Sequence, residues 1–370
     1  MCVFSGPGLV FVGERNCQIE EVVVDASSLR PGEVLVELEL SIVSAGTEVA
    51  NFTGLDPGTR VPGSWNAYPH RPGYGAIGHV VALGPGLAEP RTSVTVGSRV
   101  FAICRHARYG VADLSVRPVV PVLPDDDART MVLARMASVA FTAVRKGSRL
   151  DLGGTAVVIG LGLVGNFAAQ LLGLAGLRVL CVDRAEDRVE MGRATGLTCV
   201  LVTSGNEKEV VGKSLEPGAD IVVEASGDPD ASTTAVALAR AGGEVILLGT
   251  PRGPFSGDAT KLLADVHDRG IRLVGALEWL LPLRSGPWQS RWSLYEDYLV
   301  LFELLRDGRL RTSGLVTDVV APKDSQDVYL RLARHEPGMG AVLFDWSEEK
   351  TPRWSGQRPD AASSTRNGLP

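Results

Sequence analysis

The chain has 370 residues, enough for two ordinary domains, and carries a formal net charge of −6. Hydrophobic residues make up 45% of it and charged residues 22%, as in a soluble globular protein. This acidic balance, with no basic cluster, gives no support to nucleic-acid binding, so we expect no nucleic-acid partner.

The cysteines point to a reducing compartment. Their number, five, is odd, and none of them forms a Cys-x-x-Cys pair. Two of them fall in apolar runs that we predict to be strands, so buried free thiols are the simplest interpretation. No basic and apolar segment typical of a signal peptide opens the chain, and we therefore expect a cytoplasmic protein.

Residues 1–136 are predicted to be rich in β-strands. Short apolar or alternating runs, separated by Gly and Pro, are the expected strands: 9–12, 17–24, 34–42, 72–81 and 96–101. Many short strands with glycine turns favour a small barrel or sandwich. After Leu123-Pro124-Asp125 the pattern becomes that of a helix with acidic residues at its start.

Residues 154–184 have the pattern strand, glycine turn, helix, strand, acid. A β-branched run leads into Gly160-Leu161-Gly162-Leu163-Val164-Gly165, and a second apolar run ends in Asp183. The first glycine allows a tight turn, the second lets the backbone approach a pyrophosphate, and the third lets the helix lie close to the strand. The helix N-terminus offers free N–H groups to the phosphates. This pattern predicts a dinucleotide-binding turn.

An alternative for the same stretch is a membrane span, because residues 152–177 carry no charge. The glycines, Asn166 and Gln170 argue against it, as does the change from a β-branched to a helical pattern at the glycines. We therefore expect no contact with a membrane.

Strands and helices alternate through the rest of the chain. Strands are predicted at 220–224, 243–248 and 271–277 with a helix at 229–240, which favours a doubly wound parallel sheet. A Trp-rich loop and a helix at 294–306 follow, and strands at 316–320 and 340–344 are expected to return to the first domain. The polar residues from Thr351 onward predict a disordered tail.

This layout resembles the medium-chain dehydrogenase/reductase superfamily, the alcohol dehydrogenase-like one, over residues 5–346. Besides the glycine turn, the likeness is carried by Gly46-Thr47-Glu48, by Gly73-Tyr74-Gly75-x-x-Gly78-x-Val80, by Val96-Gly97-Ser98-Arg99-Val100, and by 220–227 and 242–251. The resemblance implies an α/β protein with a GroES-like β-barrel catalytic domain (1–136 and 280–350), a Rossmann domain (137–279) and a tail (351–370). It also implies a homodimer and a small-molecule substrate.

The resemblance departs from the zinc-dependent members at the metal. The positions that match the three ligands of the catalytic zinc are Ala45, Tyr74 and Ser138, and neither alanine nor a neutral hydroxyl makes such a site. The cysteine cluster of the structural zinc is also missing, since Cys104 stands alone there. We therefore predict no zinc. A site built from His70, His79 and His106 is the weaker alternative.

Without a metal, hydrogen-bond donors must handle the charge on the substrate oxygen. Thr47 matches the hydroxyl that passes the alcohol proton in the zinc enzymes, whereas the relay histidine falls at Ala50. Tyr74 occupies the vacated imidazole position and can donate to an oxygen, and Glu48 is the nearest candidate base. The structural alternatives are that Tyr74 only fills space, that Thr47 caps a turn and that Glu48 pairs with an arginine.

The expected cofactor is NAD. Asp183 offers a carboxylate to the ribose 2′-OH and repels a 2′-phosphate, but Arg184 beside it leaves NADP open. Gly46 stands where relatives often place an arginine on the pyrophosphate, so the affinity is expected to be modest. The predicted cofactor-binding residues are Gly160, Gly162, Leu163, Val164, Gly165, Asp183, Arg184, Ser226, Gly249 and Thr250.

The predicted activity is zinc-independent interconversion of a secondary alcohol and a ketone. The 44–48 and 71–74 stretches resemble a branch with bacteriochlorophyllide and cyclitol or sugar-alcohol dehydrogenases, which favours a ring-containing or polyol substrate. Two alternatives stay open: reduction of the C=C bond of an enone or quinone, and nucleotide binding without turnover. Aromatic residues in loops are candidates to line the pocket, or else anchor those loops: Trp65, Tyr68, Trp279, Trp288 and Trp292.

Overall fold

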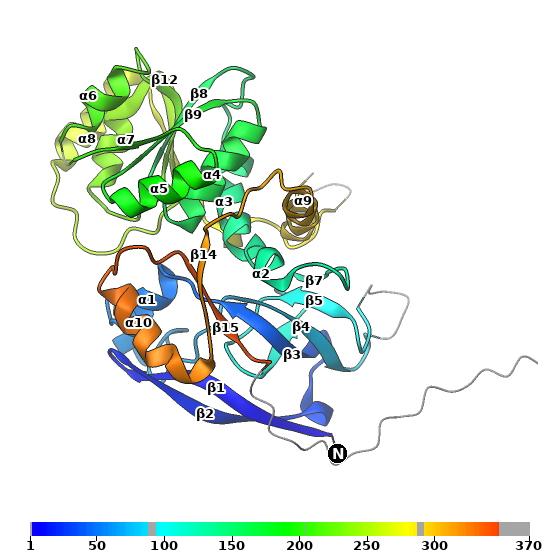
Figure 1. The fold of residues 1–370 in the computed structure, drawn as a ribbon. Helices are drawn as coiled ribbons and strands as arrows, with labels where there is room; N and C mark the ends of the chain where they lie inside the picture. The colour runs from blue at the N-terminus through cyan, green and yellow to red at the C-terminus, as the bar shows by residue number, and fades with distance from the viewer. Residues whose placement is uncertain (1, 88–93, 204, 287–291, 348–370) are drawn as a thin grey trace, which may run out of the picture.

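The computed structural model describes residues 2–87, 94–203, 205–286 and 292–347. They form two domains, one above the other in Figure 1, with the N-terminus at the outer end of the lower one. The predicted tail at 351–370 lies outside the described residues. None of the described helices has both the length and the apolar character that a membrane span needs.

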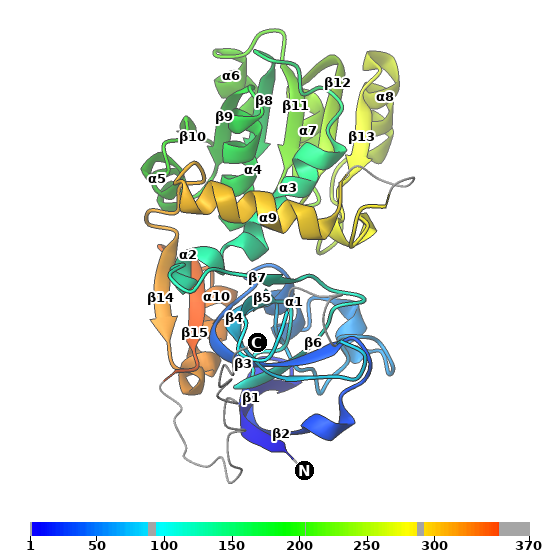
Figure 2. The ribbon, with the colours of Figure 1, turned by 90° about the vertical axis from the view of Figure 1, so that its right-hand side faces the viewer.

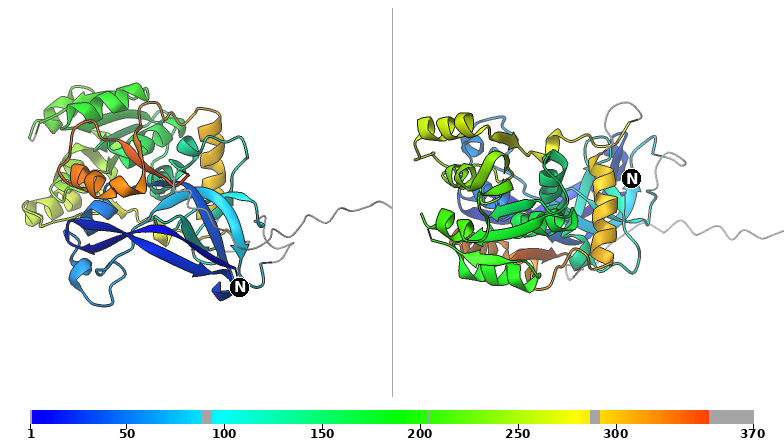
Figure 3. Two further views of the ribbon diagram at one scale, coloured as in Figure 1. Left: turned by 60° about the horizontal axis from the view of Figure 1, so that its bottom comes forward. Right: turned by 90° about the horizontal axis from the view of Figure 1, so that it is seen from above.

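The catalytic domain is built on a mixed, mainly antiparallel sheet. Its strand order is β14-β15-β3-β4-β5-β7, with β6 paired to β3. A separate β1–β2 hairpin runs along the outer side of the domain, in blue in the left view of Figure 3. The strands are β1 (Val3–Gly13), β2 (Asn16–Asp25), β3 (Glu33–Ile42), β4 (Gly75–Leu83), β5 (Arg99–Ala102), β6 (Tyr109–Asp113), β7 (Val119–Pro121), β14 (Val316–Val320) and β15 (Ala341–Asp345).

The strand β3 shows why this sheet forms. Its alternating Val34, Val36 and Leu38 enter one apolar core, whereas Leu40 and Ile42 enter the larger core that continues toward the second domain. β14 and β15 come from the end of the chain and join this sheet beside β3. The chain therefore returns to its first domain, as the late apolar runs suggested.

The second domain is a doubly wound sheet with helices on both faces, seen from above in the right view of Figure 3. Its described strands follow the order β10-β9-β8-β11-β12-β13, and all neighbours are parallel. The elements are β8 (Thr155–Ile159), α4 (Leu163–Leu174), β9 (Arg178–Asp183), α5 (Glu186–Ala194), β10 (Cys199–Leu201), α6 (Glu207–Gly212), β11 (Ala219–Glu224), α7 (Ala231–Leu238), β12 (Ala239–Leu247), α8 (Ala259–Arg269) and β13 (Arg272–Gly275).

This sheet confirms the predicted fold class. The strand order reverses between β8 and β11, and a crevice at the carboxyl ends of the strands is expected at such a point. Strands of the parallel sheet read as nearly continuous apolar runs because both of their faces are covered by helices.

Two helices connect the domains. α3 (Ala134–Lys146) follows α2 (Ala128–Met131) and packs against α4, while α9 (Leu294–Arg306) lies across α3 in Figure 2. Arg145 of α3 pairs with Asp297 of α9 at 2.5 Å, and Arg306 pairs with Asp126 at 2.8 Å. Two short helices of the catalytic domain, α1 (Thr47–Phe52) and α10 (Ser325–Ala333), were not predicted.

Candidate active site

A cleft of about 940 Å³ lies where the two domains meet. Thr47 at the start of α1 and Tyr74 just before β4 line it from the catalytic domain. From the parallel sheet, the lining includes six of the predicted cofactor residues: Gly162, Leu163, Val164, Ser226, Gly249 and Thr250. The structure therefore brings two of the three predicted catalytic residues to the predicted cofactor turn.

The glycine turn has the geometry that a pyrophosphate needs. Gly160 has φ +91°, in the left-handed region that favours glycine. A Cβ on Gly165 would lie 1.8 Å from the Gly160 carbonyl oxygen, so this position needs glycine for helix–strand packing. A Cβ on Gly162 would meet nothing within 4 Å. Backbone N–H groups at the start of α4 have no side-chain cap within the described chain, so these residues fit a dinucleotide phosphate.

Asp183 and Arg184 make different contacts. The Asp183 carboxylate accepts hydrogen bonds from the backbone N–H of Leu161 at 2.6 Å and of Ala185 at 2.9 Å, which ties the end of β9 to the glycine turn. The Arg184 guanidinium is held by two carboxylates, Glu207 at 3.0 Å and Asp228 at 3.5 Å. Its charge is therefore already neutralised by the protein.

Glu224 supports the cofactor side of the cleft and was missed by the sequence analysis. Its buried carboxylate accepts from the backbone N–H of Ser226 at 2.7 Å, from the Ser226 hydroxyl, and from the Gly227 N–H at 3.2 Å. Burial raises the pKa of Glu224. The sequence did offer a signal for Glu224: it is an acidic residue at the end of an apolar strand, just before Ser226-Gly227.

Arg252 was also missed, and it bridges the two domains. It follows β12 and lines the cleft, where its Nη1 lies 3.2 Å from a carboxylate oxygen of Asp56. Its Nη2 donates to the Thr47 hydroxyl oxygen at 3.5 Å. A positive charge thus reaches the cleft beside Gly46, although Gly46 stands where relatives often place an arginine on the pyrophosphate.

Tyr74 is half-buried and faces the cleft. Its hydroxyl has no hydrogen-bond partner within the described part of the chain, whereas its ring lies 4.0 Å from the Cζ atom of Arg135. The phenol is therefore anchored by its ring, and its O–H remains available to a molecule in the cleft.

Glu48 does not lie where the sequence analysis placed it. Its carboxylate is buried in the catalytic domain, where Oε2 accepts from the Tyr329 hydroxyl at 2.7 Å and lies 3.1 Å from Nε2 of His106. Thr47, its neighbour in the chain, lines the cleft, and Glu48 is not among the lining residues. Burial and the nearby carboxylate raise the pKa of Tyr329. Within the described chain the carboxylate of Glu48 thus contacts a histidine and a tyrosine, and not the arginine of the alternative interpretation.

The three positions that match zinc ligands do not offer a zinc site. Ala45 has no donor, the Tyr74 phenol lies beside a guanidinium, and the Ser138 hydroxyl donates to Glu278. Zinc prefers thiolate, imidazole and free carboxylate ligands, and a neighbouring cation opposes a second one. Among the described residues no three His, Cys, Asp or Glu side chains gather as a metal site would require. The residues present do not fit a catalytic zinc.

The three histidines of the alternative site are not together. His79 pairs with Glu39 on the surface at 2.9 Å, and His106 is buried beside Glu48. The His70 ring packs edge-on against Trp65.

The loop aromatics do not line the cleft. Tyr68 donates its hydroxyl to the Asn51 carbonyl, Trp65 packs on His70, and Trp292 stacks on Arg145. The centre of the Trp279 ring lies 3.9 Å from the Cζ atom of Arg117 and 5.1 Å from that of Arg135. Trp288 lies outside the described residues. The described aromatics therefore anchor loops, which was the structural alternative.

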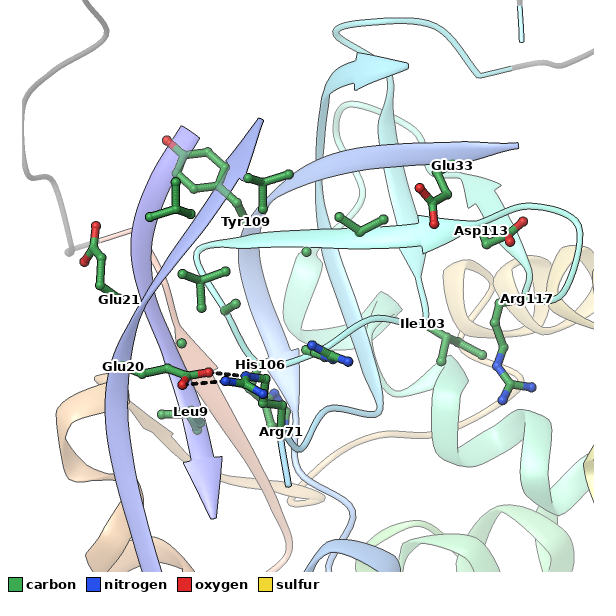
Figure 4. Close-up of a pocket in the computed structure, with 18 of the residues that line it drawn as sticks. Leu9, Glu20, Glu21, Glu33, Arg71, Ile103, His106, Tyr109, Asp113 and Arg117 are labelled. Atoms are coloured by element: carbon green, nitrogen blue, oxygen red, sulfur yellow. Dashed lines mark hydrogen bonds and ion pairs between the residues drawn. The ribbon is translucent and has the colours of Figure 1, made fainter. Parts of the chain in front are cut away.

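A second cavity, of about 590 Å³, lies between the β1–β2 hairpin and β6. Figure 4 shows the paired Glu20 and Arg71 at one end and Arg117 at the other. No residue predicted to bind cofactor or substrate lines it. The cleft between the domains is therefore the candidate site.

Comparisons with known proteins show which dehydrogenases this chain is similar to. A family model described as zinc-binding dehydrogenase matches residues 164–280, which excludes Ala45, Tyr74 and Ser138. D-guloside 3-dehydrogenase of Escherichia coli (strain K12) is 25% identical over 333 residues, covering 82% of this chain and 90% of that protein. The 2-desacetyl-2-hydroxyethyl bacteriochlorophyllide A dehydrogenase of Cereibacter sphaeroides is 24% identical over 357 residues, covering 91% and 97%.

A solved structure with bound cofactor has the same fold. An alcohol dehydrogenase of Escherichia coli CFT073, complexed with NADH, superposes with a TM-score of 0.72 at 16% identity, covering 92% of this chain and 99% of that one.

Proposed function

Because the chain belongs to the medium-chain dehydrogenase/reductase superfamily, we propose that it is a zinc-independent, NAD-dependent enzyme that interconverts a secondary alcohol and a ketone. Its relatives are alcohol and polyol oxidoreductases, so oxidoreduction itself follows from the family. One observation carries the finer proposal: a free Tyr74 hydroxyl and the Thr47 hydroxyl line the cleft that contains the cofactor turn, beside positions that lack zinc ligands.

The proposed reaction divides the work between cofactor and chain. The bound nicotinamide supplies or accepts the hydride, which is the cofactor's own chemistry. In the direction of reduction, Tyr74 donates its proton to the substrate oxygen as the carbonyl becomes an alcohol, and then regains a proton from solvent. Thr47, held by Arg252, donates a second hydrogen bond to the same oxygen. Glu224 fixes the Ser226–Gly227 turn, which lines the cleft and would support a bound dinucleotide.

The proposed cofactor is NAD rather than NADP. Asp183 ends β9 beside the glycine turn, where its negative charge opposes a 2′-phosphate. Arg184 is occupied by Glu207 and Asp228, which supports this choice because a phosphate would have to displace two carboxylates.

The proposed substrate is a polyol or another ring-containing alcohol. Support comes from the guloside and bacteriochlorophyllide dehydrogenases among the relatives. The cleft itself offers hydroxyl and guanidinium groups from Ser44, Thr53 and Arg15, which suit a substrate with several hydroxyls.

The proposed assembly is a homodimer through the free edge of β13. Apolar side chains are exposed there and just beyond: Leu273, Leu277, Trp279 and Leu280. An exposed strand edge with apolar neighbours is a common site of pairing. The five cysteines are free, which suits a reducing compartment such as the cytoplasm.

The discriminating experiment is a screen of purified protein with NADH and NADPH against cyclic ketones, keto-sugars, enones and quinones. The proposal predicts oxidation of NADH by ketones, and oxidation of the corresponding alcohols by NAD. Turnover of enones alone would favour C=C reduction. Tight NADH binding without turnover of any carbonyl would favour a non-catalytic nucleotide-binding protein.

A further inference from the structure

A buried ion pair lies directly behind Tyr74. Arg135, near the start of α3, has 0% of its side chain exposed and Glu278, after β13, has 3%. Nη1 of Arg135 donates to Oε1 of Glu278 at 2.9 Å, and Nη2 lies 2.8 Å from Oε2. The Ser138 hydroxyl donates to the same carboxylate. The pair thus joins α3 to the strand edge of the cofactor domain.

The guanidinium of Arg135 lies near two aromatic rings. Its Cζ lies 4.0 Å from the centre of the Tyr74 ring and 5.1 Å from that of Trp279. A Cβ on Gly75 would lie 2.9 Å from Cβ and Cγ of Arg135, so the glycine after Tyr74 makes room for this side chain. Tyr74, Gly75 and Arg135 therefore fit one another as a unit.

Stability alone is a poor explanation for this arrangement. A buried ion pair usually stabilises a fold no better than well-packed apolar side chains, because both charges lose their water. Here Nε of Arg135 also lacks a hydrogen-bond partner, and Nη2 of Arg135 and Oε2 of Glu278 meet at 2.8 Å as an ion pair without hydrogen-bond geometry. Burial would lower the pKa of Arg135, but the carboxylate of Glu278 raises it above its ordinary value, so the guanidinium stays charged.

We propose that the Arg135–Glu278 pair is a positioning device for Tyr74, and that its guanidinium takes the place that the zinc-ligand positions leave empty. This inference rests on the proposed function. The stack on Arg135 holds the phenol ring so that its O–H faces the cleft, and the fixed positive charge lies over the ring that takes up negative charge as the proton leaves. Arg135 acts through Tyr74 and does not itself line the cleft.

The test compares two double variants, each of which removes both charges of one buried ion pair. In R135M/E278M both charges are replaced by apolar side chains, so no buried charge is left unpaired. R145M/D297M is the matched control, because Arg145 lies on the same helix, pairs with a buried carboxylate and stacks on Phe141 and Trp292. We expect both variants to fold, to bind NADH as the wild type does, and to differ in turnover. R135M/E278M should lose about 100-fold in kcat, and R145M/D297M no more than about threefold.

Two results overturn the proposal: wild-type kcat in folded R135M/E278M, or an equal loss of kcat in both variants. If R135M/E278M does not fold, R135K carries the test, since lysine keeps the charge but not the planar stack. We expect R135K to lose about tenfold in kcat with an unchanged KM for NADH. Wild-type kcat in R135K would then overturn the proposal.

Zinc content tests the proposal without turnover. A45C/Y74H/S138C installs three zinc ligands, and it should bind only traces of zinc while Arg135 remains, because the guanidinium opposes a divalent cation. The same substitutions combined with R135M/E278M should bind about one zinc per chain. Full zinc occupancy with Arg135 present overturns the proposal, as does only trace zinc in the combined variant. If no carbonyl is turned over by the wild type, the proposed function fails, and zinc content still decides whether Arg135 occupies this place.

Discussion

At the scale of single residues, the site depends on side chains that no local motif joins. Tyr74 and Thr47 lie inside motifs with fixed spacing, and both line the cleft. Arg135 and Glu278 are 143 residues apart, so their contact exists only after α3 has packed against the β13 end of the parallel sheet. Glu48 was misplaced because α1 was not predicted, and the face of a helix decides where a side chain points.

Tyr74→Phe removes the proposed proton donor and keeps the ring that stacks on Arg135. We expect kcat to fall about 100-fold, with the KM for NADH and the thermal midpoint unchanged, because only the O–H is lost. Steady-state kinetics and thermal unfolding check this. Unchanged turnover would remove Tyr74 from the mechanism and leave it the role of filling space.

Asp183→Ser removes the carboxylate that opposes a 2′-phosphate. We expect the ratio of kcat/KM for NADPH to that for NADH to rise about tenfold, and the affinity for NADH to fall. Arg184→Ala is the comparison, and it should leave the ratio unchanged because Glu207 and Asp228 already hold that guanidinium. A wild-type protein that prefers NADPH would contradict the cofactor assignment.

At the scale of elements, several periodic patterns were predicted correctly, whereas the amphipathic helix α8 was not predicted. The helix 294–306 and the strand 316–320 have the predicted bounds, and the strands of the parallel sheet match to within a few residues. Short helices such as α1 and α10 escaped prediction, because packing rather than their own pattern stabilises them.

The ion pair between Arg306 of α9 and Asp126, just before α2, leads us to expect that the stability of the fold depends on pH. Hydrogen bonds from Arg306 lower the pKa of Asp126, and the hydrogen bond from the N–H of Leu123 lowers it further, whereas burial raises it. A depressed carboxyl pKa stabilises the fold above the unfolded value of about 4 and loses that contribution as the pH falls through the folded pKa. We expect Asp126→Asn to lower the free energy of unfolding by about 1 kcal/mol at neutral pH. We also expect the variant's free energy of unfolding to fall less steeply than that of the wild type as the pH is lowered. Urea unfolding of the wild type and the variant at neutral and acidic pH measures both effects. An equal loss of stability at the two pH values would contradict this role of Asp126.

At the scale of the whole molecule, the two-domain layout followed from composition and motif order, because the glycine turn and the strand alternation fix a parallel sheet. The position of the cleft could also be expected, since the strand order reverses there. The second cavity and the Arg252 bridge depend on long-range packing and were not accessible from the sequence.

The proposed dimer can be tested at the β13 end of the sheet. Leu280 is 69% exposed there, and Leu263, on the outer helix α8, is 63% exposed. We expect Leu280→Arg to convert the dimer to monomer, because a charge would be buried at the interface, and Leu263→Arg to leave the mass unchanged. Light scattering after size exclusion reports the mass. A monomeric wild type, or a dimer that tolerates Leu280→Arg, would contradict this interface.

The most direct test of the central claim is the metal content of the purified protein, measured together with its NADH-dependent turnover in the presence of a zinc chelator. The account predicts no stoichiometric zinc and full turnover in chelator, because hydroxyl groups of the chain handle the substrate oxygen. One zinc per chain whose removal abolishes turnover would contradict it.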